Sequence, residues 1–173
     1  MAGIRKLGDD TIERAGVSLV LEVRRVLART PTADAIGALH LKNYKLPAAS
    51  PGDFAVTKIR RTSLRVRNPE NAPDAADRAA LDRIKDQLER GDPVSEVLVQ
   101  RVTLPGLPPE WRVYRPIAAM KQCLDCHGKA AALAPGVAVR LKELYPADAA
   151  VDYTQTEWRG LFRVSIADPV ARK

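Results

Sequence analysis

The sequence predicts an α+β domain built on an antiparallel sheet, and three observations lead to this prediction. Apolar residues recur at helical spacing through much of the first 27 residues. Later stretches show the short, alternating apolar pattern of strands, and no regular strand–helix–strand alternation typical of a parallel sheet accompanies them. The expected strands are residues 54–67, 97–104, 111–117 and 162–166. At 173 residues, the chain is long enough for one domain with its own core.

The helices are predicted from periodicity and from the residues at their ends. They are expected at residues 9–27, 33–43, 75–90, 118–127 and 135–144. Asp9 and Asp10 can cap the first helix, while Asp74 opens the third and Gly91 closes it. The core face of that third helix is expected to carry Ala80, Leu81, Ile84 and Leu88.

The remaining segments divide the chain and connect its elements. Residues 1–30 are assigned to an N-terminal amphipathic helix, and residues 31–173 to the domain that follows it. The strands over 97–104 and 111–117 are separated by a proline-rich turn and pair naturally as a hairpin. Loops or constrained turns are expected at residues 46–53, 68–73 and 148–157.

The motif that carries chemistry is Cys-x-x-Cys-His, formed by Cys123, Cys126 and His127. This spacing is the attachment signature of a c-type haem. Two thiols three residues apart can each add to one vinyl group of the macrocycle. The histidine that follows them can ligate the iron as its proximal ligand. The sequence therefore predicts one covalently attached haem c.

A zinc site and a thiol redox pair both fit the chain less well than a haem. A structural zinc site needs four cysteine or histidine ligands, and this chain has only Cys123, Cys126, His127 and His40. Two of these four are adjacent in sequence, which is a poor spacing for zinc. A thioredoxin-like redox pair requires a parallel βαβ pattern around the cysteines, and no such pattern follows the motif.

The charge of the chain limits its partners. Lys and Arg exceed Asp and Glu by 28 to 21, which gives a formal net charge of +7. This basic excess suits haem propionates or redox partner proteins with an acidic docking surface. No recognition motif for nucleic acid accompanies it, so no nucleic-acid partner is expected.

The expected localisation follows from the haem. No stretch reaches the ~18 apolar residues of a membrane-spanning helix. Residues 17–23 are too short and too closely flanked by charge to be a secretory signal. Because c-type haem is attached outside the cytoplasm, we expect a periplasmic protein whose export signal is absent from this chain. Membrane association is expected only through a missing anchor or a partner complex.

Several segments together resemble a known family, the single-haem c-type domains with a PAS-like fold. This family contains small periplasmic cytochromes and haem sensor domains of bacterial signalling proteins. The resembling segments are residues 61–73 (RTSLRVRNPENAP), 114–117 (YRPI), 123–128 (CLDCHG), 144–148 (LYPAD) and 158–164 (WRGLFRV). The resemblance extends over residues 35–166 or so and includes the order of the motifs.

The resemblance implies a five-stranded antiparallel PAS-like sheet with flanking helices and a covalently attached haem on its concave face. It also implies electron transfer, or redox and gas sensing, as function. The chain departs from the family pattern in two places. Some members carry a cysteine, a candidate sixth iron ligand, in the region that corresponds to residues 35–40. These residues of this chain include no cysteine. Glycines are common around Tyr153 in the family, whereas this chain has Asp152 and Thr156.

His40 is the leading candidate for the sixth iron ligand. It is the one histidine of the chain besides His127, and it lies within one residue of the family's ligand position. A histidine that only makes a hydrogen bond is the alternative for this residue. Met120 is tethered too closely to Cys123 to reach the other face of a haem, and Tyr44 is a weaker candidate. An open site for a small gas is the remaining alternative.

Cationic residues near the resembling segments are candidates for binding the haem propionates, since arginine binds carboxylates with two parallel hydrogen bonds. An ordinary solvated strand face is the alternative for each of them. Asn68 can fix the turn beside them, and Tyr114 is expected to pack or donate a hydrogen bond nearby. The full set of cofactor-binding candidates beyond the motif is Arg61, Arg65, Arg67, Asn68, Tyr114 and Arg115.

The sequence therefore predicts a non-catalytic monohaem cytochrome that carries one electron, either free in the periplasm or as a haem subunit of a larger redox complex. The alternative is a sensor domain whose haem reports redox state or binds a diatomic gas. Ligation of the iron by both His127 and His40 would favour electron transfer, because it leaves no open coordination position. Enzymatic chemistry would need an open distal site, and no catalytic residue is assigned.

Overall fold

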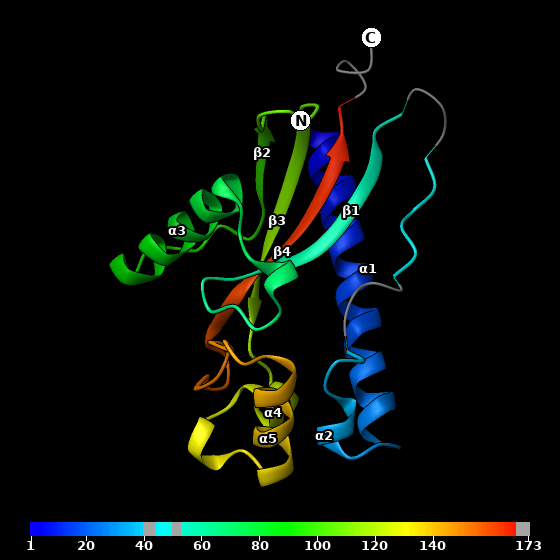
Figure 1. Cartoon of the computed structure of the whole chain (residues 1–173). Coiled ribbons are helices and arrows are strands. Elements are labelled where there is room, and N and C mark those ends of the chain that lie inside the picture. Colours follow the sequence, from blue (N-terminus) through cyan, green and yellow to red (C-terminus); the bar gives the residue numbers. More distant parts are fainter. Residues whose placement is uncertain (40–43, 50–52, 169–173) are drawn as a thin grey trace.

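The computed structural model describes residues 1–39, 44–49 and 53–168, and these form a four-stranded antiparallel sheet with helices around it (Figure 1). The strands are β1 (Ala55–Thr62), β2 (Leu98–Val102), β3 (Glu110–Ala118) and β4 (Trp158–Ala167). Their order is β1-β4-β3-β2, so β1 and β2 are the edges. The predicted α+β class and the β2–β3 hairpin are confirmed. The fifth strand implied by the resemblance is not among the described residues.

Helices flank the sheet and also gather beyond one of its ends (Figure 1). They are α1 (Ala2–Leu27), α2 (Thr32–Ala35), α3 (Ala75–Arg90), α4 (Leu124–His127) and α5 (Pro135–Leu144). Single 3-10 turns are η2 (Pro69–Asn71), η3 (Lys121–Cys123) and η4 (Ala130–Ala132). The end with α2, α4 and α5 is the one at which β3 finishes and β4 begins. Within the described ranges, no helix combines the length and the hydropathy that crossing a membrane requires.

The face of the sheet that α1 covers is apolar. Val113 of β3 and Val164 of β4 pack there with Ile4 and Ile12 of α1. Gly8 marks the closest approach, since a Cβ at this position would lie 2.3 Å from the Val113 side chain. Only a glycine allows the helix to rest so directly on β3.

The opposite face carries a buried network of charges under α3. Asp77, whose side chain is fully buried, accepts hydrogen bonds from Tyr114 at 2.9 Å and from Arg112 and Arg163 at 3.0 Å each. Asp74, the N-cap of α3, accepts from Arg112 at 2.7 Å. Burial would raise the pKa of Asp74, but hydrogen bonds from Arg112 and from the Asp77 backbone lower it to about 2. Charged hydrogen bonds thus fix α3 to β3 and β4.

The predicted strand over residues 54–67 is too long at its C-terminal end. Ser63 Oγ donates to the carbonyl oxygen of Arg159 at 2.8 Å and accepts from the Arg65 backbone N–H at 3.1 Å. These local bonds turn the chain away from the sheet after β1. Arg65 and Arg67 therefore do not lie on a strand face, contrary to the prediction.

Three helix predictions are corrected in part. Asp9 and Asp10 lie inside α1 and do not cap it, because the helix already begins at Ala2. Within the described part of residues 33–43, α2 ends at Ala35, and Gly37 then has a φ of 92° that no helix can continue. The cap and the glycine stop of α3 are confirmed, but Leu88 is 44% exposed and lies outside the core.

We expect Asp77→Ala to lower the free energy of unfolding by about 3 kcal/mol, since removing one partner leaves buried guanidinium groups uncompensated. Chemical denaturation measures this change. Asp82→Ala, at an exposed position of the same helix, is the matched control and should change stability by less than about 0.5 kcal/mol. Equal losses in the two variants would contradict the assigned role of the network.

Candidate haem site

The Cys-x-x-Cys-His motif follows β3 directly and lies in η3 and α4. The predicted single helix is replaced by two short turns that begin after Met120, which is extended (φ −89°, ψ 163°). The thiols of Cys123 and Cys126 are free and half-buried. Gly128 ends α4, and a Cβ there would lie 2.6 Å from the carbonyl oxygen of Leu124. A glycine is therefore required where the chain leaves the motif.

The imidazole of His127 is held in one orientation by the chain. Its Nδ1 lies 2.7 Å from the carbonyl oxygen of Ala150 and donates to it, since a carbonyl can only accept. Nε2 faces Nη1 of Arg67 at 3.5 Å, which is long for a hydrogen bond. Burial and the positive charges of Arg67 and Arg159 lower the pKa of His127 to about 3. The ring is therefore neutral near pH 7, with a poorly satisfied lone pair on Nε2.

The irregular segment between α5 and β4 holds the Cys-x-x-Cys-His motif by hydrogen bonds. The backbone N–H groups of Asp152 and Tyr153 donate to the carbonyl oxygens of Gly128 and His127 at 2.8 and 2.9 Å. Asp152 and Thr156 adopt positive φ angles of 62° and 69°. These are the two positions at which the sequence departs from a glycine-rich pattern. Both positions therefore adopt the left-handed backbone conformation, which glycine adopts without strain. At Thr156 the side chain is β-branched, so this conformation costs free energy.

Arg67 ties the motif to this segment. Its Nε donates to Asp148 Oδ2 at 2.9 Å in a largely buried ion pair. Its Nη2 donates to the carbonyl oxygens of Cys126 at 2.6 Å and of Ala150 at 3.1 Å. One guanidinium therefore holds the second thiol-bearing residue and the carbonyl that orients the imidazole.

Tyr153 supports the imidazole from the side. Its ring meets that of His127 edge to face, with centroids 6.3 Å apart. The guanidinium of Arg65 stacks on the tyrosine ring at 3.8 Å, and that of Arg159 lies 4.9 Å from the ring centroid. Arg65 also pairs with Glu157 at 3.1 Å. Arg65 therefore stacks on the Tyr153 ring, which in turn contacts the imidazole of His127.

Positive charge is concentrated around the motif. Burial and the neighbouring charge of Arg159 lower the pKa of Arg61 to about 10, while the proximity of Cys123 acts in the opposite direction. Burial also lowers the pKa of Arg159. Arg67 contributes to the repulsion at both sites. An anionic group bound here would relieve this repulsion.

Two of the predicted cofactor-binding residues, Arg61 and Asn68, line one cavity of about 580 Å³ beside β1 and η2. Asn68 also caps η2 by accepting from the Glu70 backbone N–H at 2.9 Å. Tyr44, the weaker candidate for the sixth ligand, lines the same cavity. His40, the leading candidate, lies outside the described residues.

The structure does not bring Tyr114 and Arg115 to the motif. The Tyr114 hydroxyl donates to Asp77 under α3, and burial raises its pKa. Arg115 points to the opposite face and pairs with Asp9 of α1 at 3.3 Å. Both placements follow from strand geometry, because neighbouring residues in the middle of β3 face opposite sides of the sheet.

Sequence reasoning missed three contributors to the site. Asp148 and Arg159 lie in the resembling segments, so they could have been proposed as partners of the motif. The third contributor is the backbone carbonyl of Ala150, and a backbone group leaves no signal in the residue types.

Comparisons with known proteins identify the family of the chain. A family model described as Tll0287-like matches residues 23–167, most of the chain and all of the site described above. The chain belongs to the Tll0287-like family. No curated protein is similar enough to count as a match.

One solved structure is similar to this chain in fold. The crystal structure of the cyanobacterial haem protein Tll0287 is similar with a TM-score of 0.50 and 24% sequence identity. The similarity covers 66% of this chain and 62% of that protein, so the chain spans less than two thirds of its structural relative. The fold is shared over the matched part.

Neither a zinc site nor a thioredoxin-like redox pair gains support from the structure. Across residues 1–39, 44–49 and 53–168, no group of three or more potential metal ligands is clustered, as a zinc site would need. The strands in these ranges are all antiparallel, which differs from the parallel βαβ surroundings of thioredoxin-like cysteine pairs.

We expect Arg67→Ala to loosen the motif from the segment that carries it. Amide hydrogen exchange at Asp152 and Tyr153, whose N–H groups bond to the motif, should accelerate roughly tenfold or more. Arg140→Ala, at an exposed arginine of α5 paired with Glu143, is the matched control and should leave both amides protected. Unchanged protection in Arg67→Ala would show that the remaining contacts suffice.

Proposed function

We propose that this chain is a non-catalytic c-type cytochrome that carries one electron on a single covalent haem. Cys123 and Cys126 would hold the haem through thioether bonds, and His127 would ligate its iron through Nε2. Membership of the Tll0287-like family and the similarity to a haem protein support the proposal. When bound, the haem supplies a one-electron redox centre.

The observation that carries this proposal is the state of His127. Metal-ligating histidines almost always donate their second ring N–H to a carbonyl or carboxylate, which fixes the tautomer. His127 makes this bond to Ala150 and presents a neutral Nε2 whose one described polar neighbour, Arg67, stands at 3.5 Å. The imidazole is thus already prepared as a metal ligand beside two free thiols.

The surrounding charge also fits a haem, which carries two propionates. Arg61, Arg67 and Arg159 repel one another around the motif, and carboxylates would offset this repulsion. Arg61 and Asn68 line a cavity next to this region and would bind the same groups. Asp148 would keep Arg67 in place.

Electron transfer is proposed because His40 would take the sixth position on the iron. A second protein ligand leaves no coordination position for a gas or a substrate, which argues against sensing of gases and against catalysis. The net charge of +7 favours redox partners with an acidic docking surface. Because c-type haem is attached outside the cytoplasm, the proposed location is the periplasm.

Visible absorption spectra of the protein, produced by export together with the haem attachment machinery, test this proposal. The oxidised and reduced wild type should both be low-spin, and carbon monoxide should leave the reduced spectrum unchanged. His40→Ala should turn high-spin and bind carbon monoxide. Tyr44→Phe, which changes the weaker candidate ligand, is the matched control and should keep the wild-type spectrum.

Two results would overturn parts of the proposal. Ready binding of carbon monoxide by the wild type, together with an unchanged spectrum in His40→Ala, would remove His40 as ligand and favour a gas sensor. Absence of any haem spectrum after production with the attachment machinery would overturn the proposal as a whole.

A further inference from the structure

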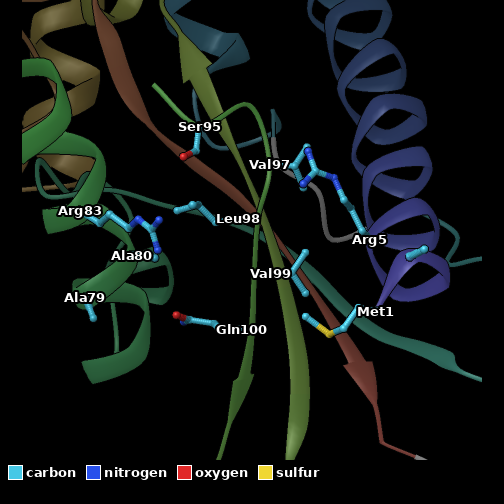
Figure 2. A pocket seen from close by; sticks show the side chains of 11 residues that line it. Met1, Arg5, Ala79, Ala80, Arg83, Ser95, Val97, Leu98, Val99 and Gln100 are labelled. Atoms are coloured by element: carbon cyan, nitrogen blue, oxygen red, sulfur yellow. The ribbon is translucent and has the colours of Figure 1, made fainter. Parts of the chain in front are cut away.

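A groove of about 590 Å³ runs along the outer edge of the sheet, at β2 (Figure 2). It is bounded on one side by the start of α1 and on the other by α3, with consecutive residues of the β2 segment between them. None of its lining residues belongs to the Cys-x-x-Cys-His motif or to the segment that holds it. The groove is therefore a feature separate from the candidate haem site.

The middle of this groove is an unpaired sheet edge. β2 pairs with β3 on one side and has no strand on the other among the described residues. Half of the backbone N–H and C=O groups of an edge strand point outward, where they can pair with an added strand. Within residues 1–39, 44–49 and 53–168, no backbone hydrogen bond is made to this outer edge.

The side chains of the edge are arranged as in an ordinary sheet strand. Val97 and Val99 pack with the core under α1, whereas Leu98 packs with the core under α3. Gln100 donates to the carbonyl oxygen of Ala76 in α3. A strand added at this edge would continue the same alternation, with its side chains lying toward α1 and α3 in turn.

Two arginines give the groove its charge. Arg5 of α1 and Arg83 of α3 reach toward β2 from opposite sides (Figure 2). Both are exposed, and neither side chain forms an ion pair with any residue in the described ranges. No acidic residue from the described part of the chain lines the groove. The charge therefore favours carboxylates as the groups to be bound.

We propose that this groove binds an extended, acidic segment of a partner protein, which adds to the sheet as a strand beside β2 and places carboxylates near Arg5 and Arg83. Backbone pairing would supply affinity, and the two arginines would select acidic sequences. A second copy of this chain fits less well, because pairing two β2 edges would bring two like pairs of arginines together. β2 has five residues, so the bound segment would be about five residues long.

The first test uses defined peptides and the haem-loaded protein. A labelled six-residue peptide with pairs of adjacent glutamates between valines presents carboxylates on both faces of a strand, and it should bind with a Kd that fluorescence anisotropy can measure. A peptide of equal length with lysine in place of glutamate should bind at least tenfold more weakly. Two acidic peptides methylated on alternate backbone nitrogens should differ from each other, since a strand uses only every second N–H toward its neighbour.

Charge-reversal variants then locate the binding. Arg5→Glu combined with Arg83→Glu should weaken binding of the acidic peptide at least tenfold and strengthen binding of the lysine peptide. Arg14→Glu combined with Arg78→Glu is the matched control, because these exposed arginines lie on the same two helices but do not line the groove. Amide exchange in β2 should slow when the acidic peptide binds.

Several outcomes would overturn the proposal. They are absence of acidic-peptide binding, equal losses in the two double variants, equal binding of both methylated peptides, and unchanged amide exchange in β2. Formation of a dimer through β2 without peptide would assign the groove to a second copy instead. None of these outcomes depends on the iron ligands, so failure here is distinct from failure of the cytochrome proposal.

Discussion

The guanidinium of Arg67 is the group on which the candidate site depends most. It contacts Asp148, the carbonyl oxygen of Cys126 and the carbonyl oxygen of Ala150, with its side chain largely withdrawn from water. Ala150 in turn fixes the tautomer of His127. A single arginine therefore connects the backbone of Cys126, the carbonyl that orients the imidazole, and Asp148 of the supporting segment, because its planar donors can bind three acceptors at once.

The sheet holds the candidate site in position, although the Cys-x-x-Cys-His motif itself lies outside the strands. β3 delivers the motif at its C-terminal end, and β4 begins after the segment that supports the imidazole. Both strands are fixed on one face by apolar packing against α1, at Gly8, and on the other by the charges around Asp77. The two rigid strands thus hold the ends of the irregular segments, which keeps the site in place although it contains little regular structure.

The sequence predicted the features that depend on local chemistry. The cap at Asp74, the β2–β3 hairpin and the Cys-x-x-Cys-His motif are encoded by residues close together in the chain. Features set by distant contacts were missed. β1 ends early because Ser63 bonds to Arg159, and the carbonyl of Ala150 has no signature in the residue types. Arg61 and Arg67 were identified as a cationic surround, but the sequence could not show that one of them also holds the motif.

The central claim is that Cys123 and Cys126 attach one haem covalently. The most direct measurement is the mass of the intact, fully denatured protein after production with the attachment machinery, since unfolding releases every haem that is not covalently bound. We expect a mass increase equal to one haem for the wild type, and none when Cys123→Ala and Cys126→Ala are combined. A denatured wild type with the mass of the polypeptide alone would show that the two cysteines do not attach a haem.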